Sequence, residues 1–182
     1  MTTTHLAARH LSQLVIIDVQ EKLAAVMPDE GLQALVKNCG ILLQAAALLE
    51  IPVLHTEQYP RGLGHTLPAL AVPGTAIEKT TFSCCAEPKF CRQLTGDRPQ
   101  VILAGMEAHI CVLQTALALQ ADGRQVFVVE DAVLSRNAGN KANAMSRLRH
   151  AGVVVTNTES VIFEWLGKAE GEAFKQISRL VR

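Results

Sequence analysis

The chain has 182 residues, of which 49% are apolar and 4% aromatic, and this is enough to build one well-buried core. Its 17 Lys and Arg residues balance its 17 Asp and Glu residues, so no net charge attracts nucleic acid or an anionic membrane surface. We therefore expect neither of these partners.

The beginning of the chain and its cysteines indicate where the protein works. The first residues, MTTTHLAARHLSQ, lack the apolar core of a signal peptide, and no later stretch approaches the roughly 20 apolar residues of a membrane-spanning helix. Five cysteines, an odd number, argue against a disulfide framework. We expect a soluble, cytoplasmic protein with reduced thiols.

Short apolar runs rich in β-branched residues alternate with longer segments of helical period. In chain order we expect a strand at 14–18, a helix at 31–49, strands at 52–56, 76–79 and 100–105, a helix at 110–121, a strand at 125–131, a helix at 137–149, a strand at 153–157, and helices near 159–166 and 170–181. Apolar runs without polar alternation are typical of parallel strands buried on both faces. The pattern predicts one α/β domain over residues 1–182, with a doubly wound, mostly parallel six-stranded sheet and helices on both faces, a Rossmann-like three-layer sandwich.

Three chemically active side chains follow predicted strands. Asp18 ends the first strand, Lys79 ends the third, and the fourth continues through GMEAHI into Cys111. Ligands of such sheets bind beyond the carboxyl ends of the strands. A thiol at a helix N-terminus lies near unpaired backbone N–H groups, which favour the thiolate. Taken singly, Asp18 could cap a turn, Lys79 could be a solvated charge and Cys111 could fill the core.

Other features of the sequence limit the choice of cofactor. Cys39 and Cys91 lie in predicted helices and are most simply core residues. The adjacent pair Cys84-Cys85 matches neither a zinc-ligand spacing nor a redox C-x-x-C motif. Neither G-x-G-x-x-G nor a P-loop is present, so we expect no nucleotide cofactor. The long irregular stretch 57–74 is expected to carry function or to contact a partner.

Four segments resemble the isochorismatase-like cysteine hydrolase family, which includes nicotinamidases and N-carbamoylsarcosine amidases. They are IIDVQEKL at 16–23, EKTTFSC at 78–84, GMEAHICV at 105–112 and VVEDAVLSR at 128–136, in family order and over nearly the whole chain. The sequence is most similar to the short branch of isochorismatase domain-containing proteins.

The resemblance implies an Asp-Lys-Cys catalytic triad. Cys111 would be the nucleophile and Asp18 the general base and acid. Lys79 would be the cation that offsets the negative charge beside it, and all three groups would titrate as a unit. Family members have a cis peptide bond before the residue that matches Glu107. The backbone N–H groups of Glu107 and Cys111 would then form the oxyanion hole.

Two further polar residues of these segments are expected to be structural. His109, where nicotinamidases often have Asp, is interpreted as a solvated residue at the helix start, and Asp131 as a structural residue at the end of the fifth strand. The side chain of Glu107 could be structural or could contact substrate.

The departures from the family pattern concern metal and substrate. Nicotinamidases place Asp-x-His and a further His after the second strand to hold a metal, whereas this chain has Glu57-Gln58-Tyr59 with His65 further on. We expect no metal, because His55, Glu57 and His65 form a partial ligand set and such loop residues more often bond locally. Isochorismatases proper lack the nucleophilic cysteine, so Cys111 argues against vinyl-ether hydrolysis.

Four residues are candidates for binding substrate. They are Gln20, Leu23, Tyr59 and Phe82, which would suit a small, partly apolar ligand. Ordinary packing is the alternative for each of them.

The sequence thus favours a hydrolase that cleaves the C–N bond of a small amide through a thioester. We expect a small-molecule substrate, no cofactor and a homo-oligomer, since the terminal helices and the long loop suit self-association. Two alternatives stay open. One is a thiol redox sensor that uses Cys111 with Cys84 or Cys85, and the other is a catalytically idle, oligomeric binding protein on the same fold.

Overall fold

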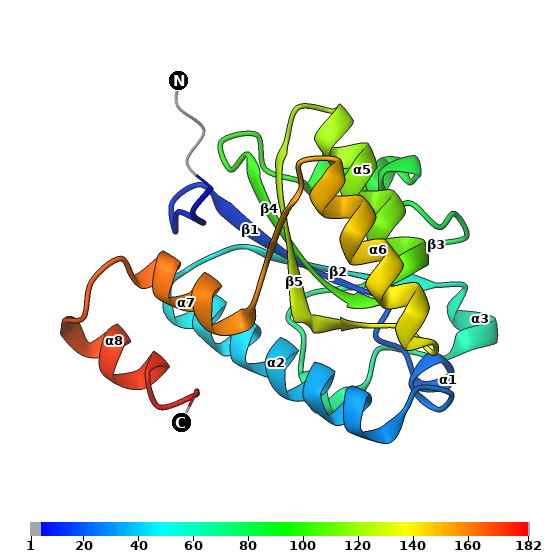
Figure 1. Ribbon diagram of the computed structural model, residues 1–182, viewed down its shortest axis with the longest axis horizontal. Helices are drawn as coiled ribbons and strands as arrows, with labels where there is room; N and C mark the ends of the chain where they lie inside the picture. The colour runs from blue at the N-terminus through cyan, green and yellow to red at the C-terminus, as the bar shows by residue number, and fades with distance from the viewer. Residues whose placement is uncertain (1–4, 182) are drawn as a thin grey trace.

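A six-stranded parallel sheet in the order β3-β2-β1-β4-β5-β6 forms the centre of the molecule (Figure 1). This computed structural model describes residues 5–181. The strands are β1 (Ser12–Ile17), β2 (Val53–Gln58), β3 (Ile77–Lys79), β4 (Gln100–Met106), β5 (Gln125–Leu134) and β6 (Val154–Thr156). The predicted α/β fold with a six-stranded parallel sheet is confirmed.

Helices connect the strands. They are α1 (Glu21–Ala24), α2 (Asp29–Leu48), α3 (Pro60–Leu63), α4 (Pro88–Gln93), α5 (Leu113–Ala121), α6 (Ala138–His150), α7 (Thr158–Leu166) and α8 (Gly171–Ile177). Short 3-10 turns, η1 (Pro68–Leu70) and η2 (Cys84–Ala86), and one π-helical turn, η3 (Ala108–Val112), complete the connections. Most predicted boundaries are within a few residues of these; β5 extends three residues beyond its prediction and α8 ends four residues earlier.

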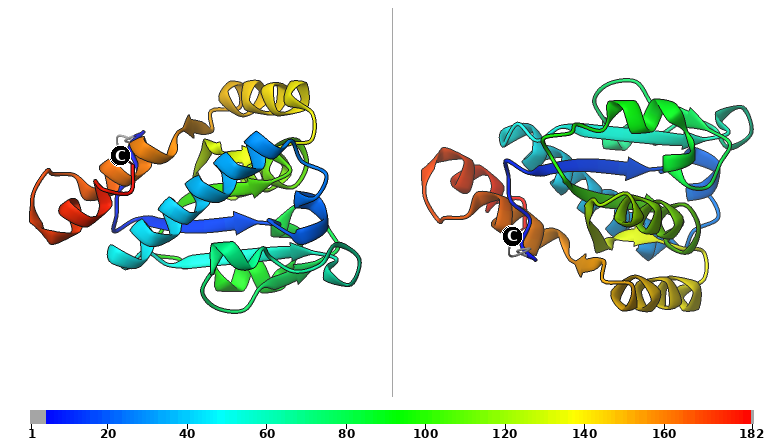
Figure 2. Two further views of the ribbon diagram at one scale, coloured as in Figure 1. Left: turned by 90° about the horizontal axis from the view of Figure 1, so that it is seen from below. Right: turned by 90° about the horizontal axis from the view of Figure 1, so that it is seen from above.

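The central strands are apolar on both faces because helices cover both faces. Every residue of β1 and β4 is buried. The two panels of Figure 2 show α2 crossing one face of the sheet and α5 lying over the other. The first face buries Leu42 of α2 and Trp165 of α7, and the second buries Phe90 of α4 and Leu119 of α5. Continuous apolar strands therefore produce two separate cores, one on each side of the sheet.

Helix α2 differs from the sequence expectation in one respect. Its 20 residues are long and apolar enough, by length and composition alone, to cross a membrane. The expectation that no stretch approaches that length is therefore wrong. In the structure α2 packs along the sheet with Leu35, Cys39 and Leu42 buried in the core, as core helices of this composition do.

Asparagine residues fix where α6 and α7 begin. The side-chain oxygen of Asn137 accepts a hydrogen bond from the N–H of Gly139 at 2.8 Å, and that of Asn157 accepts one from the N–H of Ser160 at 2.8 Å. Such caps satisfy donors that lack partners within the helix. Helix α7 ends at Leu166 and is followed by Gly167, whose φ of 68° is a left-handed conformation that glycine adopts without steric cost.

The order of the strands reverses at β1, and this positions the site. Chain connections run from β1 outward through β2 to β3 on one side, and from β4 outward to β6 on the other. The carboxyl ends of β1 and β4 therefore border the crevice where sheets of this class bind ligands.

A glycine allows these two strand ends to approach each other. Gly105 pairs with Ile17 and has φ of 126°, and a Cβ atom there would overlap the carbonyl oxygen of Ile17. Glycine is required because backbone, rather than a movable side chain, occupies the space. The approach places Asp18 beside the turn that leads to Cys111.

Candidate active site

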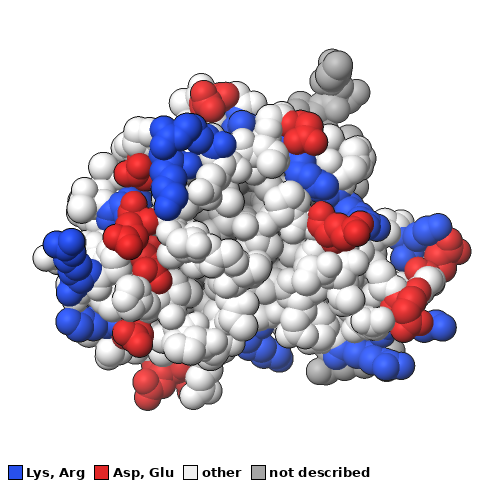
Figure 3. Space-filling view, turned by 180° about the vertical axis from the view of Figure 1, so that it is seen from behind, with Lys and Arg blue, Asp and Glu red and all other residues white. Residues whose placement is uncertain are grey.

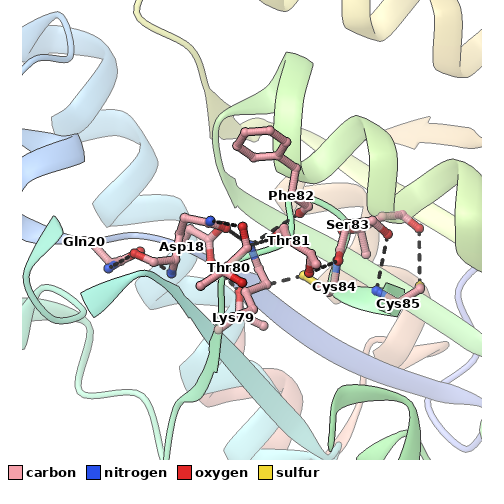
Figure 4. Close-up of polar contacts among 12 residues, drawn as sticks. Asp18, Gln20, Lys79, Thr80, Thr81, Phe82, Ser83, Cys84 and Cys85 are labelled. Carbon is pink, nitrogen blue, oxygen red and sulfur yellow. Dashed lines mark hydrogen bonds and ion pairs between the residues drawn. The ribbon is translucent and has the colours of Figure 1, made fainter. Parts of the chain in front are cut away.

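Asp18 and Lys79 form a buried ion pair at the carboxyl edge of the sheet. The Lys79 Nζ lies 2.7 Å from Asp18 Oδ2, and neither side chain is exposed to solvent (0% for both). Asp18 follows β1 with φ of 50°, and Lys79 is the last residue of the edge strand β3. Figure 4 shows the two side chains facing each other, with the ring of Phe82 directed away from them. The fold thus brings together two of the three predicted catalytic residues in direct contact.

The ammonium group of Lys79 has several acceptors. Besides Asp18, the side-chain oxygen of Gln58 accepts at 2.7 Å and the carbonyl oxygen of Thr81 at 3.2 Å. Burial by itself lowers the pKa of Lys79, but the carboxylate of Asp18 and the hydrogen bond to it outweigh this effect, so the net shift is upward. Lys79 is therefore a cation with a fixed orientation.

Thr56 holds the second oxygen of Asp18. Its hydroxyl donates to Asp18 Oδ1 at 2.7 Å, while Cys84 Sγ lies 3.9 Å from the same hydroxyl oxygen. The N–H of Cys84 in turn donates to Thr115 Oγ1 at 3.0 Å. Each carboxylate oxygen of Asp18 thus has its own donor, which sets the rotation of the group.

Cys111 lies inside the helical turn rather than at its start. The turn η3 begins at Ala108, so Cys111 is the fourth residue, and its side chain is 6% exposed. Burial raises the pKa of the Cys111 thiol, and the charge of Asp18 and a hydrogen bond to it raise it further, whereas Lys79 acts in the opposite direction without compensating. Desolvation and the neighbouring carboxylate therefore act against the thiolate that a helix N-terminus favours.

The remaining cysteines differ in exposure. Cys39 and Cys84 are buried, Cys85 is half-buried and Cys91 is exposed. The expectation that Cys91 fills the core is wrong, because Phe90, the residue before it on α4, points into the core instead. Burial raises the pKa of Cys84 to about 11, although Lys79 lowers it in part.

The segment between β4 and Cys111 carries the candidate oxyanion hole. The peptide bond between Met106 and Glu107 is cis, as the resemblance implied. The carbonyl oxygen of Glu107 accepts hydrogen bonds from the N–H groups of Ile110 and Val112, at 3.0 and 3.3 Å. These bonds fix the turn on both sides of Cys111.

The side chain of Glu107 is tied to Arg136, which follows β5. Its Oε2 accepts from the backbone N–H of Arg136 at 3.0 Å, and its Oε1 lies 3.2 Å from Arg136 Nε. Glu107 is buried while the Arg136 side chain is 57% exposed. The carboxylate therefore anchors the loop after β5 to the loop after β4.

His109 is held by neighbours and is not a freely solvated residue as expected. Its Nδ1 lies 3.0 Å from Ser135 Oγ and its Nε2 lies 3.3 Å from Asn140 Nδ2. The two contacts on opposite sides of the ring fix the orientation of His109. Asp131 has a structural role, because its Oδ1 accepts from the N–H and hydroxyl groups of Thr158 at the start of α7.

A pocket of about 170 Å³ opens beside Cys111. Its lining consists of Leu23, Gln58, Leu63, Phe82, Glu107, Ile110 and Cys111. Larger hollows exist elsewhere, including one of about 560 Å³ between α2 and residues 69–73, but it contains none of the candidate catalytic residues. Two of the predicted substrate-binding residues, Leu23 and Phe82, thus lie at the nucleophile.

The other two predicted substrate-binding residues lie outside this lining, and their role stays a prediction. The Gln20 side-chain amide donates to the carbonyl oxygens of Gln58 and Gly64, at 3.0 and 2.7 Å, and accepts from the N–H of Gln58. Tyr59 has φ of 39°, its ring packs over Gly62, and it lines a second hollow on the β3 edge, of about 380 Å³, whose lining also includes Lys79. Gln20 thus fastens the end of β2 to the following loop.

Two of the three residues considered for a metal, Glu57 and His65, bond to each other, and Glu57 also bonds to Thr66. Glu57 accepts from the N–H and hydroxyl groups of Thr66, at 2.7 and 2.8 Å, and lies 3.0 Å from His65 Nδ1. Burial would raise the pKa of Glu57, but these hydrogen bonds lower it overall. Burial lowers the pKa of His55. Within residues 5–181, no group of three or more His, Cys, Asp or Glu side chains is placed to hold a metal ion.

Sequence reasoning missed several residues of the site. Thr56, Gln58 and Arg136 bond directly to Asp18, Lys79 and Glu107. Thr56 and Gln58 belong to β2, the neighbour of both β1 and β3, so their proximity depends on strand order. The position of β2 between β1, which Asp18 follows, and β3, which ends with Lys79, could have indicated Thr56 and Gln58.

Comparison with known proteins agrees with this fold. The isochorismatase domain model matches residues 12–160. Isochorismatase domain-containing protein 2 of Danio rerio is 40% identical over 172 residues, which cover 93% of this chain and 86% of the relative.

Two solved structures share the fold. The MAR1 ribonuclease of Caenorhabditis elegans has 37% identity and a TM-score of 0.89, with 97% of this chain and 92% of that chain covered. The ycaC gene product of Escherichia coli, an octameric hydrolase of unknown specificity, has 19% identity and a TM-score of 0.87, with 99% and 92% covered. At 19% identity the second similarity supports the fold alone.

Proposed function

Because this chain belongs to the isochorismatase family, we propose that it is a cysteine hydrolase that cleaves the C–N bond of a small amide through a thioester on Cys111. The observation that carries the proposal is the buried pair of Asp18 and Lys79, whose carboxylate interacts with the Cys111 thiol. A carboxylate held by two donors next to a protonated nucleophile is suited to general-base catalysis.

In the acylation step, Asp18 removes the proton of the Cys111 thiol as the sulfur attacks the carbonyl carbon of the amide. The carbonyl oxygen becomes an oxyanion, which the backbone N–H groups of Glu107 and Cys111 stabilise. Asp18 then gives its proton to the amide nitrogen, the C–N bond breaks, and the amine leaves. Lys79 keeps its charge throughout and stabilises Asp18 whenever the carboxylate is ionised.

In the deacylation step, water attacks the thioester carbon while Asp18 takes one of its protons. The tetrahedral intermediate collapses, the C–S bond breaks, and Asp18 returns the proton to the sulfur. The products are a carboxylic acid and an amine, and the enzyme regains its thiol. One carboxylate thus serves both steps as base and then as acid.

The proposal is tested by measuring ammonia release from a panel of small primary amides. The parent should release ammonia, and Cys111→Ala should release none above background, because it lacks the atom that forms the thioester. Intact-mass spectrometry of the parent should detect the acyl adduct on Cys111.

Two results would contradict this proposal, and each favours a different alternative. Absence of ammonia and of any adduct would favour an idle binding protein. A disulfide between Cys111 and Cys84 or Cys85 under mild peroxide, again without turnover, would favour a redox sensor.

The charge balance of the chain, 17 Lys and Arg residues against 17 Asp and Glu residues, favours a small amide over RNA as the substrate, although the relative from C. elegans is named a ribonuclease. Lys and Arg side chains alternate with Asp and Glu side chains over the face in Figure 3. Nucleic-acid binding relies on continuous basic surfaces.

We also propose a reducing, cytoplasmic location and self-association. All five cysteines are free thiols in the structure. Helix α8 extends beyond the edge of the sheet in both panels of Figure 2, and Phe163 of α7 contacts Phe174 of α8, with ring centroids 6.4 Å apart. An extended helical arm of this kind is suited to contacts between copies of the chain, which light scattering would measure as a multiple of 19.6 kDa.

A further inference from the structure

The pocket beside Cys111 combines small size with an apolar wall. Leu23 comes from α1, Leu63 from α3, Phe82 from the loop after β3, and Ile110 from η3. At about 170 Å³ the pocket is smaller than the roughly 300 Å³ at which sites for drug-sized ligands begin. Only a small group fits between these four side chains and the sulfur of Cys111.

The amide of Gln58, one of the two polar side chains in the lining besides Cys111, is already bonded at both ends. Its oxygen accepts from Lys79 Nζ at 2.7 Å, and its nitrogen donates to the carbonyl oxygen of Thr80 at 2.8 Å. These bonds fix the orientation of the amide, and its second N–H group and second oxygen lone pair are uncharged groups that match a neutral ligand.

The charged groups at the pocket occur as neutral pairs. Glu107 is paired with Arg136, and Asp18 behind Cys111 is paired with Lys79. A carboxylate or ammonium group on the ligand would therefore lie against apolar side chains without an unpaired countercharge, which is unfavourable.

We infer that the substrate is an uncharged amide whose acyl group is short and apolar, with Leu23 as a determinant of this specificity. The inference rests on the proposed function and names its substrate class. Each methylene group buried against Leu23, Leu63 and Phe82 should raise kcat/KM roughly fourfold until the pocket is full. A carboxylate at the end of an acyl chain of the same length should lower it at least tenfold.

The first test measures ligand preference without turnover. Two iodoacetamides are compared, one with an N-butyl group and one with a carboxylate-tipped chain of matching length, and peptide mapping gives the alkylation rates of Cys111 and Cys91. The exposed Cys91 corrects for the intrinsic reactivity of each reagent. The Cys111 to Cys91 ratio should be at least tenfold higher with the butyl reagent. Equal ratios, a higher ratio for the charged reagent, or no labelling of Cys111 by either would overturn the inference.

The second test uses variants to change which ligand the pocket prefers. Leu23→Arg should raise the relative labelling of Cys111 by the carboxylate-tipped reagent at least tenfold, because it adds an unpaired cation to the lining. Val26→Arg is the matched control, since Val26 follows α1, is 56% exposed and lies outside the lining, and it should leave the ratio unchanged. Leu23→Ala provides a milder variant, which should extend the preferred chain by one or two carbons. Unchanged selectivity in both folded Leu23 variants would exclude Leu23 as a determinant.

The experiments can exclude the hydrolase proposal or the inferred substrate class without excluding the other. If no amide releases ammonia while the labelling preference holds, hydrolysis is excluded and the preference of the pocket for uncharged apolar ligands stands. If amides are hydrolysed and carboxylate-bearing amides are preferred, the inference is wrong and the hydrolase proposal stands.

Discussion

Asp18 uses its two carboxylate oxygens for different partners, Thr56 on one side and Lys79 on the other, both at 2.7 Å. With both oxygens already engaged, the carboxylate has one orientation relative to Cys111. Proton transfer is sensitive to such placement, because donor and acceptor must be within hydrogen-bond reach in the transition state. At the scale of the residue, the site is therefore preorganised by hydrogen bonds that Asp18 accepts.

The proposed role of Asp18 gives different expectations for amides and activated esters. Asp18→Asn should abolish acylation by an unactivated amide, because expulsion of an amine without a proton donor is very unfavourable. A matching activated ester needs no such proton, so its acylation should be impaired less. Acyl-enzyme formation is measured by intact mass for both substrates.

Asp131→Asn is the matched control for this experiment, because Asp131 bonds to Thr158 at the start of α7 and lies outside the site. It should retain parental acylation rates. Amide acylation at the parental rate in Asp18→Asn would exclude Asp18 as the group that transfers the proton.

At the scale of elements, the site depends on how closely β4 approaches β1. Gly105 allows this approach, and the π-helical turn η3 then carries Cys111 to the crevice. Turns of this kind often occur at functional sites. The end of β4 and η3 therefore act as one positioning unit for the nucleophile.

Two glycine-to-alanine variants should have opposite effects on stability. Gly105→Ala should lower the free energy of unfolding by at least about 3 kcal/mol, because its Cβ meets backbone atoms of β1 and its φ is strained for alanine. Gly40→Ala, in the interior of α2 with nothing within 4 Å of the added Cβ, should raise it by about 0.5–1 kcal/mol. Urea denaturation of both variants measures the difference, and equal effects would contradict the proposed close contact.

The sequence predicted the elements better than it predicted the environment of each group. Apolar runs identified all six strands, and strand ends identified Asp18, Lys79 and Cys111. The pKa of the Cys111 thiol could not be derived from the sequence, because it depends on burial and on the neighbouring carboxylate of Asp18, neither of which a local pattern contains. Cys91 was misplaced because a six-residue helix has too few turns to define its buried face.

At the scale of the whole molecule, buried thiols make the free energy of unfolding depend on pH in the alkaline range. Burial raises the pKa of Cys39 to about 12 from an ordinary value of 9.0. Between these values the unfolded chain loses the proton while the folded chain keeps it, so stability falls as pH rises above about 9. One such thiol contributes a slope of about 1.4 kcal/mol per pH unit in this window.

Cys39→Ala should therefore reduce that slope by about 1.4 kcal/mol per pH unit. The measurement is urea denaturation at several values between pH 9 and pH 11. Ile41→Val, another conservative change in α2, should lower stability by about 0.5–1.5 kcal/mol and leave the slope unchanged. An identical slope in Cys39→Ala and the parent would show that Cys39 ionises equally in both states.

The strand order also determines when the protein can fold during its synthesis. The innermost strand β1 is made before its partner β4, whose paired residues follow about 90 positions later, so at about 5–20 residues per second β1 waits on the order of 4–18 s on the ribosome. During this interval one entire edge of an apolar strand has no neighbour. A nascent chain that stalls before β4 is complete would present this edge to chaperones or to other nascent chains, and none of its catalytic chemistry could yet exist.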